Sequence, residues 1–334
     1  MTWKVLITDY VWPTIDPEKK IIEASGGEVI VSPDSSEKTL ISLAKDVDAI
    51  MTCFAQVTDN VIESAQKCVA IGRFGVGVDN IAVKKATELG IPVTYVPDYC
   101  VDEVSDHVLA MLNTWNRKIA LFDKSVKDDG WGSLNLSMRI MRLREKTLGI
   151  VGFGRIGQMV AKKASAFGMK IVASDPVIKK EEMEKLGVES VSLDDLLKIS
   201  DFVTLHAPLI PQTHNLIGTR ELNIMKKESF IINAARGPLI DENALYKALK
   251  NNVIAGAGLD VMVDNIPDKK HPLLQLDNIL VTPHIAFFSQ ESTLELEERA
   301  AQEVVRVYKG EMPENLVNPE VLTHPNPRHT IKIS

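Results

Sequence analysis

The sequence predicts an α/β protein with two doubly wound units, each a parallel sheet covered by helices on both faces. Two stretches of the chain alternate short apolar segments with amphipathic segments, which is typical of parallel sheets. A glycine-rich run lies near mid-chain, between an apolar segment and an amphipathic one. The 334 residues are enough for two domains.

The composition is that of an ordinary folded protein, with 45% hydrophobic residues, 25% charged residues and a net charge of −7. This charge predicts neither a nucleic-acid partner nor an anionic membrane partner. The N-terminal apolar segment, residues 5–7, is cut short by Asp9, which argues against a signal peptide. The scattered cysteines Cys53, Cys68 and Cys100 predict no metal site, buried reduced thiols and a cytoplasmic location.

Apolar segments bounded by turn residues define the expected strands. In the first stretch they are residues 4–8, 28–31, 48–51, 69–72 and 93–96, with helices such as 17–24 and 59–66 between them. In the second stretch they are residues 147–151, 170–173, 202–206, 230–233, 255–259 and 279–282, with helices such as 155–167 and 242–250.

Longer helical patterns connect and close the two stretches. One runs from residue 101 to about 127 between them, and another covers about residues 289–308, before a loose tail at 324–334. Because the glycine run comes late, its unit follows the first unit or is inserted in it. We expect the C-terminal helix to return to the first unit, which gives one domain of residues 1–101 and 289–334 and a second of residues 102–288.

The glycine-rich run contains Gly152, Gly154 and Gly157, spaced as in nucleotide-binding turns. The first glycine makes a tight turn, the second lets the backbone approach a pyrophosphate, and the third lets helix and strand pack closely. The helix that follows offers N–H groups and the positive end of its dipole to the phosphates. Asp175 ends the next apolar segment, at the distance expected for a carboxylate that binds the adenosine ribose and repels a 2′-phosphate. The cofactor predicted is NAD rather than NADP.

Three expected strand ends of the second stretch carry side chains suited to chemistry. Arg236, Asp260 and His284 each follow an apolar segment. Hydride transfer from an alcohol needs a base for the hydroxyl proton, and histidine titrates near neutral pH. A 2-hydroxy acid also needs a cation for its carboxylate, which a guanidinium binds in an oriented, bidentate way. The ends of neighbouring parallel strands meet at one edge of a sheet, where ligands bind.

The chain resembles the D-isomer-specific 2-hydroxyacid dehydrogenases, the family of phosphoglycerate, D-lactate and glycerate dehydrogenases. The similarity covers about residues 4 to 320. The matching motifs are residues 75–80, 151–157, 206–209 with Thr213, 232–237, 259–261 and 282–284. Segments 97–104 and 285–289 are most similar to the C-terminal-binding-protein-like branch. The resemblance implies a Rossmann NAD-binding domain and a flavodoxin-like substrate domain.

The resemblance also implies roles for single residues. His284 is the acid/base, and Arg236 binds and polarises the keto acid. The backbone of Val76 and Gly77 binds the substrate carboxylate, and Asp260 holds the nicotinamide carboxamide. The other positions implied to contact the cofactor are Arg155 and Ile156 at the pyrophosphate, His206, Ala207, Pro208, Thr213, Ala234 and Ala235.

The chain departs from the family at one catalytic position. Most members have an acidic residue five positions after the aspartate, just before a proline, and this acid hydrogen-bonds the catalytic histidine. Here the fifth position after Asp260 is Asn265, followed by isoleucine. An amide can orient His284 but supplies no charge, so we expect a lower histidine pKa than is usual in the family. Alternatively, a local shift brings Asp264 into this role.

Two classes of function remain open. One is an NAD-dependent oxidoreductase that interconverts a D-2-hydroxy acid and its 2-keto acid. The other is an NAD(H)-binding regulatory protein of the C-terminal-binding-protein type with little or no turnover. Retention of Arg236 and His284 favours the enzyme.

The substrate and the assembly are less determined by the sequence. Phe54 is expected either to border the substrate pocket or to lie in the core. Arg73 either contacts an anion or lies in solvent. The resemblance implies a homodimer whose interface includes helices near residues 108–121. The apolar stripe of Leu109, Leu112 and Trp115 fits such an interface, and it fits packing within one chain equally well.

Overall fold

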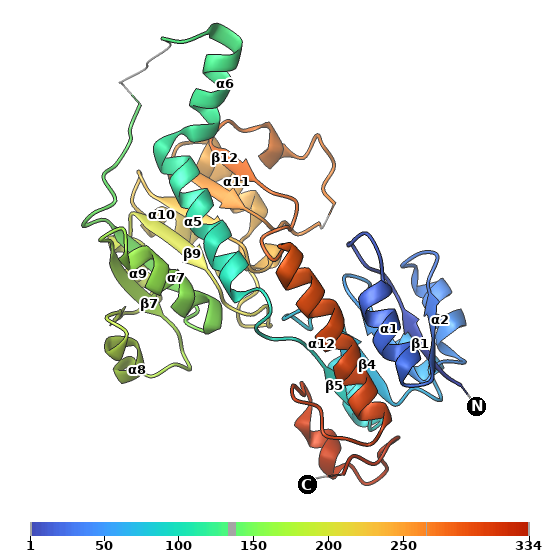
Figure 1. Cartoon of the computed structure of the whole chain (residues 1–334). Coiled ribbons are helices and arrows are strands. Elements are labelled where there is room, and N and C mark those ends of the chain that lie inside the picture. The colour runs from blue at the N-terminus through green and yellow to red at the C-terminus, as the bar shows by residue number, and fades with distance from the viewer. Residues whose placement is uncertain (1, 133–137, 265, 333–334) are drawn as a thin grey trace. The chain divides into compact units, whose positions relative to one another are not determined.

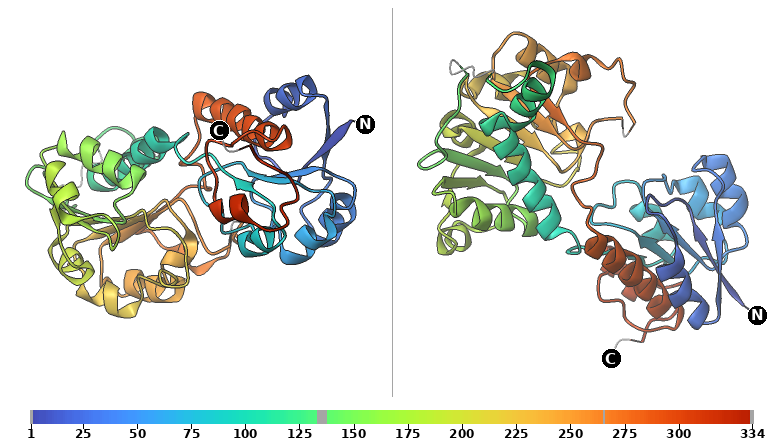
Figure 2. Two further views of the ribbon diagram at one scale, coloured as in Figure 1. Left: turned by 90° about the horizontal axis from the view of Figure 1, so that it is seen from below. Right: turned by 45° about the horizontal axis from the view of Figure 1, so that its top comes forward.

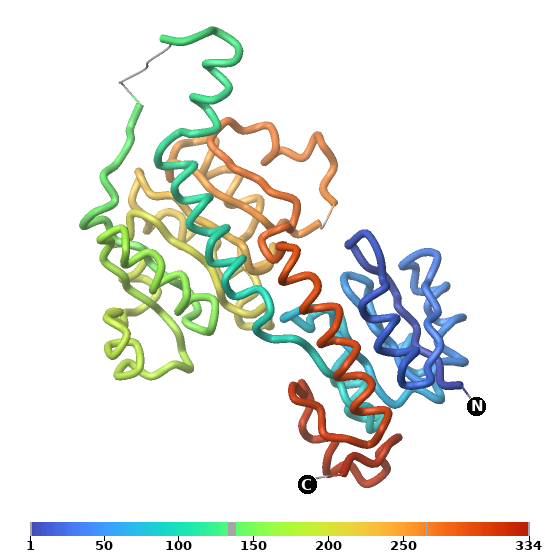
Figure 3. Tube along the Cα trace, viewed as in Figure 1, coloured from blue at the N-terminus to red at the C-terminus, as the bar shows by residue number. Residues whose placement is uncertain are grey.

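The computed structural model describes residues 2–132, 138–264 and 266–332. The chain divides into two compact units. Unit 1 comprises Met1–Tyr99 and Ser289–Ser334, and unit 2 comprises Cys100–Phe288. Figure 3 shows the blue N-terminal and the red C-terminal parts of the chain in the same unit.

Unit 1 contains a five-stranded parallel sheet in the order β2-β1-β3-β4-β5. Its elements are β1 (Trp3–Ile7), α1 (Asp16–Ala24), β2 (Gly27–Val31), α2 (Glu37–Ala44), β3 (Ala49–Thr52), α3 (Asp59–Ser64), β4 (Ala70–Arg73), α4 (Val83–Glu88), β5 (Val93–Thr94) and α12 (Gln290–Tyr308). This 2-1-3-4-5 order is that of flavodoxin-like sheets.

Helices cover both faces of the unit 1 sheet, because its strands are apolar at consecutive positions. Leu6, Ile50 and Ile71 join a buried cluster with residues of α2, α3 and α4. On the other face, α12 packs on α1 and on the central strands (Figure 1). A Cβ atom on Gly72 of β4 would lie 2.5 Å from Val304 Cγ2 of α12, so this glycine allows the helix to approach the sheet closely.

Unit 2 contains a seven-stranded parallel sheet in the order β12-β11-β10-β9-β6-β7-β8. Its elements are α5 (Val101–Arg117), α6 (Ile119–Asp129), β6 (Thr147–Val151), α7 (Arg155–Ser165), β7 (Lys170–Ser174), α8 (Lys180–Lys185), β8 (Glu189–Ser190), α9 (Leu193–Ile199), β9 (Phe202–Leu205), α10 (Thr219–Ile224), β10 (Phe230–Asn233), α11 (Glu242–Lys250), β11 (Gly256–Leu259) and β12 (Ile279–Val281). Read from β8, the order is the 3-2-1-4-5-6 of dinucleotide-binding sheets with one further strand.

The two faces of the unit 2 sheet have separate cores. Ile150 belongs to the cluster with α5 and α7, and the next residue, Val151, belongs to the cluster with α9, α10 and α11. This follows from the strand geometry, in which successive side chains point to opposite faces. Figure 2 shows these helical layers on either side of the strands. The predicted fold class, two doubly wound parallel-sheet domains, is confirmed.

The helical pattern over residues 101–127 is two helices rather than one. Lys118 adopts a left-handed backbone with φ of 56° and separates α5 from α6. Leu109 and Leu112 of α5 are buried in unit 2, and Trp115 stacks on Phe230 with ring centroids 4.7 Å apart. The apolar stripe of α5 therefore packs within the chain.

Two other expectations were wrong in detail. The two-residue strand β8 (Glu189–Ser190) was missed, because it is too short to produce an alternating pattern. The tail is not loose where it is described, since Arg328 N donates to Gly90 O and Lys332 N donates to Gly310 O. Within the described residues, no helix is long and apolar enough to cross a membrane.

Candidate functional site

The glycine-rich turn of unit 2 lies between β6 and α7, where the strand order reverses between β6 and β9. Gly152 has a φ of +88°, and a Cβ there would lie 2.6 Å from Ala207 N. A Cβ on Gly157 would lie 2.4 Å from Gly152 O. Both glycines are thus required by the protein itself. A Cβ on Gly154, in contrast, would meet no described atom within 4 Å, so open space lies beside this residue.

The start of α7 is suited to an anion. No described side chain caps this end of the helix, and Arg155 and Ile156 are its first two residues. The N–H groups of the first turn of a helix have no partner within the helix, and they lie at the positive end of its dipole. The turn and the helix start together form an anion-binding site of the kind used for phosphates.

Asp175 follows β7 and is attached to the glycine turn. Its carboxylate accepts hydrogen bonds from Phe153 N at 2.7 Å, Val177 N at 2.8 Å and Ile178 N at 3.0 Å. Burial alone would raise the pKa of Asp175, but these three backbone N–H groups outweigh it and lower the pKa below its usual value. The side chain therefore carries its negative charge at neutral pH.

The segment after β9 lines the other side of the glycine turn, because the backbone of His206 and Ala207 lies against Gly152. The His206 ring is 3.0 Å from Thr204 Oγ1, measured from Nε2, and burial lowers its pKa to about 4. His206 is therefore uncharged at neutral pH. Farther along, Thr213 Oγ1 donates to Pro208 O at 2.6 Å, which closes this loop.

Arg236, Asp260 and His284 follow the three adjacent strands β10, β11 and β12, whose ends Asn233, Leu259 and Val281 are in register. The three predicted residues thus come from one edge of the unit 2 sheet. The loop of Arg236 begins with Ala234 and Ala235, and Asn233 holds it by donating to Arg236 O at 2.8 Å and accepting from Ala235 N at 3.1 Å.

The carboxylate of Asp260 is buried and holds the loop that bears His284. It accepts hydrogen bonds from Thr282 Oγ1 at 2.6 Å and from the N–H groups of Ile285 and Ala286, both at 2.9 Å. His284 N donates to Asp260 O, and His284 has a φ of 53°. Few residues other than glycine adopt this conformation, so the Asp260 contacts fix a backbone that needs support. No local pattern in the sequence indicates this role of Asp260.

The sequence predicts two candidate partners for His284. Asn265 lies outside the described residues, and Asp264 is exposed. Asn265 and Asp264 therefore both remain predictions for this role.

A second turn with anion-binding character lies in unit 1, after β4. The backbone N–H groups of Val76 and Gly77, and of Val78, which the sequence interpretation missed, have no hydrogen-bond acceptor among the described residues. We call these three N–H groups the anion nest, because consecutive free N–H groups form a concave site for anions. The preceding loop bears Phe54, whose N–H donates to Asp9 Oδ2 at 2.7 Å.

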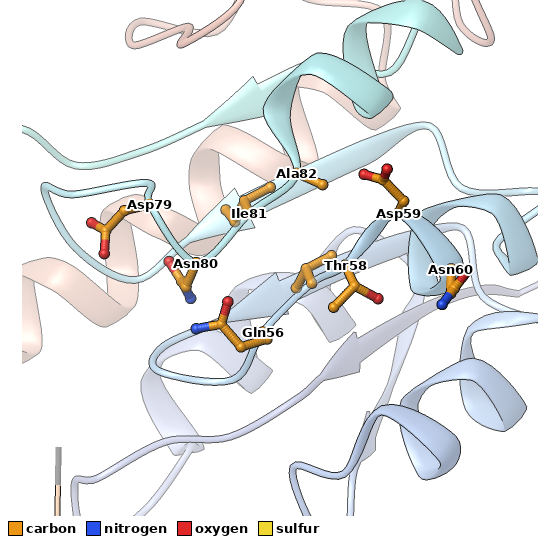
Figure 4. A pocket seen from close by; sticks show the side chains of 9 residues that line it. Gln56, Thr58, Asp59, Asn60, Asp79, Asn80, Ile81 and Ala82 are labelled. Carbon is orange, nitrogen blue, oxygen red and sulfur yellow. The ribbon is translucent and has the colours of Figure 1, made fainter. Parts of the chain in front are cut away.

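A polar pocket of about 410 Å³ lies in unit 1 beside this turn. Segments 56–60 and 79–82 line it, and Figure 4 shows the side chains of Gln56, Thr58 and Asn80 along its wall. None of the predicted site residues that the structure describes lines this pocket. Within the described part of the chain, no group of three or more His, Cys, Asp or Glu side chains could hold a metal ion.

The three cysteines all lie in the described part of the chain, where they are buried and form no disulfide bond. Burial raises the pKa of Cys53 and of Cys68 to about 12, so neither thiol is ionised at neutral pH. The cytoplasmic location inferred from the cysteines stays a prediction.

Comparison with known proteins gives the family context. The model of the NAD binding domain of the D-isomer specific 2-hydroxyacid dehydrogenases matches residues 109–286. The chain is 42% identical over 317 residues to a D-3-phosphoglycerate dehydrogenase of Methanocaldococcus jannaschii, which covers 94% of this chain but only 59% of that protein. It is 39% identical over 290 residues to a glyoxylate reductase of Korarchaeum cryptofilum, covering 86% of this chain and 87% of that protein.

A solved structure of a dehydrogenase is also similar to this chain. A D-lactate dehydrogenase of Aquifex aeolicus, crystallised with NAD and lactic acid, has a TM-score of 0.84 and 29% identity, covering 92% of this chain and 96% of that one. The predicted cofactor, NAD, is confirmed by the domain match. Similarity to the C-terminal-binding-protein-like branch stays a prediction.

Proposed function

The chain belongs to the D-isomer specific 2-hydroxyacid dehydrogenase family, and from this premise we propose that it is an NAD-dependent oxidoreductase that interconverts a D-2-hydroxy acid and its 2-keto acid. One observation carries the proposal. Arg236, Asp260 and His284 follow three adjacent parallel strands of the unit that binds NAD. The guanidinium of Arg236, the loop held by Asp260 and the imidazole of His284 therefore all come from one edge of the unit 2 sheet.

The proposed division of labour follows from the chemistry of each side chain. Bound NADH supplies the hydride for reduction of the 2-keto acid. The guanidinium of Arg236 binds and polarises the keto acid, and His284 gives a proton to the carbonyl oxygen as it becomes a hydroxyl. In the reverse direction, His284 takes the hydroxyl proton. The Asp260 contacts keep the loop of His284 in place.

The cofactor roles are proposed for residues around the glycine turn. Gly154, Arg155 and Ile156 meet the pyrophosphate, and Asp175 binds the adenosine ribose. Gly152 and Gly157 shape the turn. Lining positions are His206, Ala207, Pro208, Thr213, Ala234 and Ala235. The negative charge of Asp175 disfavours the 2′-phosphate of NADP, because like charges repel.

Unit 1 is proposed as the substrate domain, with the nest at Val76 and Gly77 binding the substrate carboxylate and Phe54 bordering the substrate. Relatives named D-3-phosphoglycerate dehydrogenase and glyoxylate reductase leave the choice of substrate open. NADH oxidation should therefore be followed with glyoxylate, pyruvate, hydroxypyruvate and longer 2-keto acids. The reverse reaction should be tried with 3-phosphoglycerate. We expect turnover with at least one small 2-keto acid.

The regulatory alternative, a protein that binds NAD(H) without turnover, is not favoured, since the named relatives are dehydrogenases and reductases. The NADH oxidation assay distinguishes the enzyme from the regulatory protein. Tight NADH binding, together with no turnover on any of these acids, would support the regulatory protein and refute the enzyme.

We also propose a homodimer. Helix α6 buries none of its own residues, and Ile119, Leu121 and Val126 on it are 55%, 46% and 39% exposed. Trp131 just beyond it is 95% exposed. An apolar surface of this kind is typical of an interface between protein chains. Light scattering should give twice the monomer mass, and Trp131→Ser with Val126→Ser should shift the protein toward monomer.

A further inference from the structure

A buried arginine ends strand β4, just before the anion nest. Arg73 is only 7% exposed. Its Nε donates to Gly77 O at 2.8 Å and to Asn80 Oδ1 at 3.1 Å, and one of its terminal nitrogens donates to Phe74 O. A buried cation is stable only when its N–H groups find acceptors. Here these acceptors belong to residues 74–80, the loop that contains the nest.

Gly75 makes space for this guanidinium. A Cβ on Gly75 would lie 2.8 Å from a terminal nitrogen of Arg73 and 3.0 Å from the central carbon of its guanidinium. Gly75 also has a φ of +147°, which side chains other than glycine rarely adopt. The loop conformation and the position of the guanidinium therefore depend on each other.

Asn80 extends the network to the loop after β3. Its amide nitrogen donates to Ala55 O at 2.8 Å and to Cys53 O at 3.2 Å, while its oxygen accepts from Arg73. The same loop is held from its other side, because Asp9 accepts from the N–H groups of Cys53 and Phe54. The two loops proposed to meet the substrate thus share one hydrogen-bonded network.

The network also determines which way the loop backbone faces. The carbonyl of Gly77 points at Arg73, and in a planar trans peptide the N–H of Val78 then points the opposite way. The N–H of Val78 therefore faces away from the buried guanidinium, and the N–H groups of Val76 and Gly77, which also have no acceptor among the described residues, precede it in the same loop. The available N–H groups and the buried positive charge of Arg73 both favour the binding of an anion.

We propose that Arg73 is a positioning residue for the substrate carboxylate, holding residues 74–80 so that the anion nest is preformed and adding its buried charge to the nest. The inference rests on the proposed function. It does not place Arg73 in contact with substrate. Because the carboxylate is present in the substrate and in the transition state alike, loss of Arg73 weakens both states equally and raises KM rather than lowering kcat.

The test compares Arg73→Lys and Arg73→Gln with wild type. Lysine keeps the positive charge but lacks the planar guanidinium group, and glutamine lacks both. We expect KM for the keto acid to rise about tenfold for the lysine variant and about a hundredfold for the glutamine variant, with kcat within about threefold of wild type. The dissociation constant for NADH should not change. Arg328→Lys is the matched control, since Arg328 also donates to a backbone oxygen of unit 1, that of Ala65.

Three results would overturn the proposal. They are an unchanged KM in Arg73→Lys, a fall in kcat at constant KM, or an equal effect of Arg328→Lys. If Arg73→Gln does not fold, Arg73→Lys and Gly75→Ala carry the test, because the added methyl group displaces the guanidinium. Oxamate titration by calorimetry gives a readout without turnover. If wild type reduces no keto acid, the proposed function fails, whereas equal oxamate affinity in wild type and Arg73→Lys refutes only the role of Arg73.

Discussion

The two glycine-bearing turns, residues 152–157 of unit 2 and 74–80 of unit 1, both follow a buried parallel strand, but they obtain positive potential from different sources. The unit 2 turn leads directly into the 11-residue helix α7, whose uncapped start provides N–H groups and a dipole. The unit 1 turn has no helix directly after it, because α4 begins only at Val83. There the potential comes from the buried guanidinium of Arg73.

The glycines show the same difference. A Cβ on Gly154 would meet no described atom within 4 Å, whereas a Cβ on Gly75 would meet the guanidinium of Arg73. In the proposed function, the open space at Gly154 takes the cofactor pyrophosphate. The space at Gly75 is filled by a side chain of the protein itself. The two units are therefore expected to respond differently to substitution.

The largest effect is expected where unit 2 carries the proposed proton transfer. His284→Gln should lower kcat by about 10²- to 10⁴-fold, because a positioned acid/base contributes on that order. The affinity for NADH should stay near that of wild type. Steady-state kinetics and NADH fluorescence titration measure the two quantities. His324→Gln in unit 1 is the control, and a kcat for His284→Gln near wild type would remove the proposed role.

A smaller effect is expected at two glycines of the unit 2 turn, Gly154 and Gly157, which should respond differently to substitution. Gly154→Ala should weaken NADH binding by about tenfold to a hundredfold and leave the melting temperature almost unchanged, because its Cβ would meet no described atom within 4 Å. Gly157→Ala should lower the melting temperature, since its Cβ would lie 2.4 Å from Gly152 O. Calorimetry and thermal unfolding distinguish them. Equal NADH affinity in Gly154→Ala and wild type would show that the open space is not used by the cofactor.

Asp175 tests the choice of cofactor. Asp175→Asn removes the negative charge, so the ratio of kcat/KM for NADPH to that for NADH should rise about tenfold. Because the carboxylate also accepts three backbone hydrogen bonds, the variant should melt at a lower temperature. Asp194→Asn, at a half-buried carboxylate of unit 2 that pairs with Arg220, is the control. An unchanged ratio would mean that another residue excludes the 2′-phosphate.

The smallest effect concerns a buried acid pair in unit 1. Burial and the neighbouring Glu18 raise the pKa of Glu297 to about 8, and Glu18 also accepts a hydrogen bond from Trp12, whose ring packs edge-on against Phe74 at the start of the nest loop. The folded state then holds a proton that the unfolded state loses above its ordinary pKa. The free energy of unfolding should therefore fall as pH rises from about 4.5 to about 8.

Glu297→Gln cannot titrate and should flatten this dependence. Denaturant unfolding at pH 5, 6.5 and 8 measures it, with Glu298→Gln, an exposed neighbour on α12, as the control. The same slope in wild type and Glu297→Gln would contradict the assignment.

Long apolar segments and the glycine spacing made the fold and the cofactor predictable from sequence. The position of Asp175 followed from its distance to the glycines, and Arg236, Asp260 and His284 followed from their places after strands. Such arguments work because parallel strands bring their ends to one edge.

What could not be predicted depends on contacts distant in sequence. Arg73 at a strand end looks like a solvated residue until residues 74–80 fold over it. The break at Lys118 has no glycine or proline to mark it, although Lys118 adopts a left-handed backbone. The hydrogen bonds from Ile285 and Ala286 to the carboxylate of Asp260 join two loops that are distant in the sequence, and no local pattern indicates them.

Transfer of deuterium from NADH labelled at C4 to a 2-keto acid tests the central claim most directly. With pyruvate or hydroxypyruvate as acceptor, the account predicts label at C2 of the product and D configuration there. When only one of the two hydrogens at C4 of NADH is replaced by deuterium, we expect transfer from one of these two positions and not from the other. Unlabelled product, or product of L configuration, would contradict it.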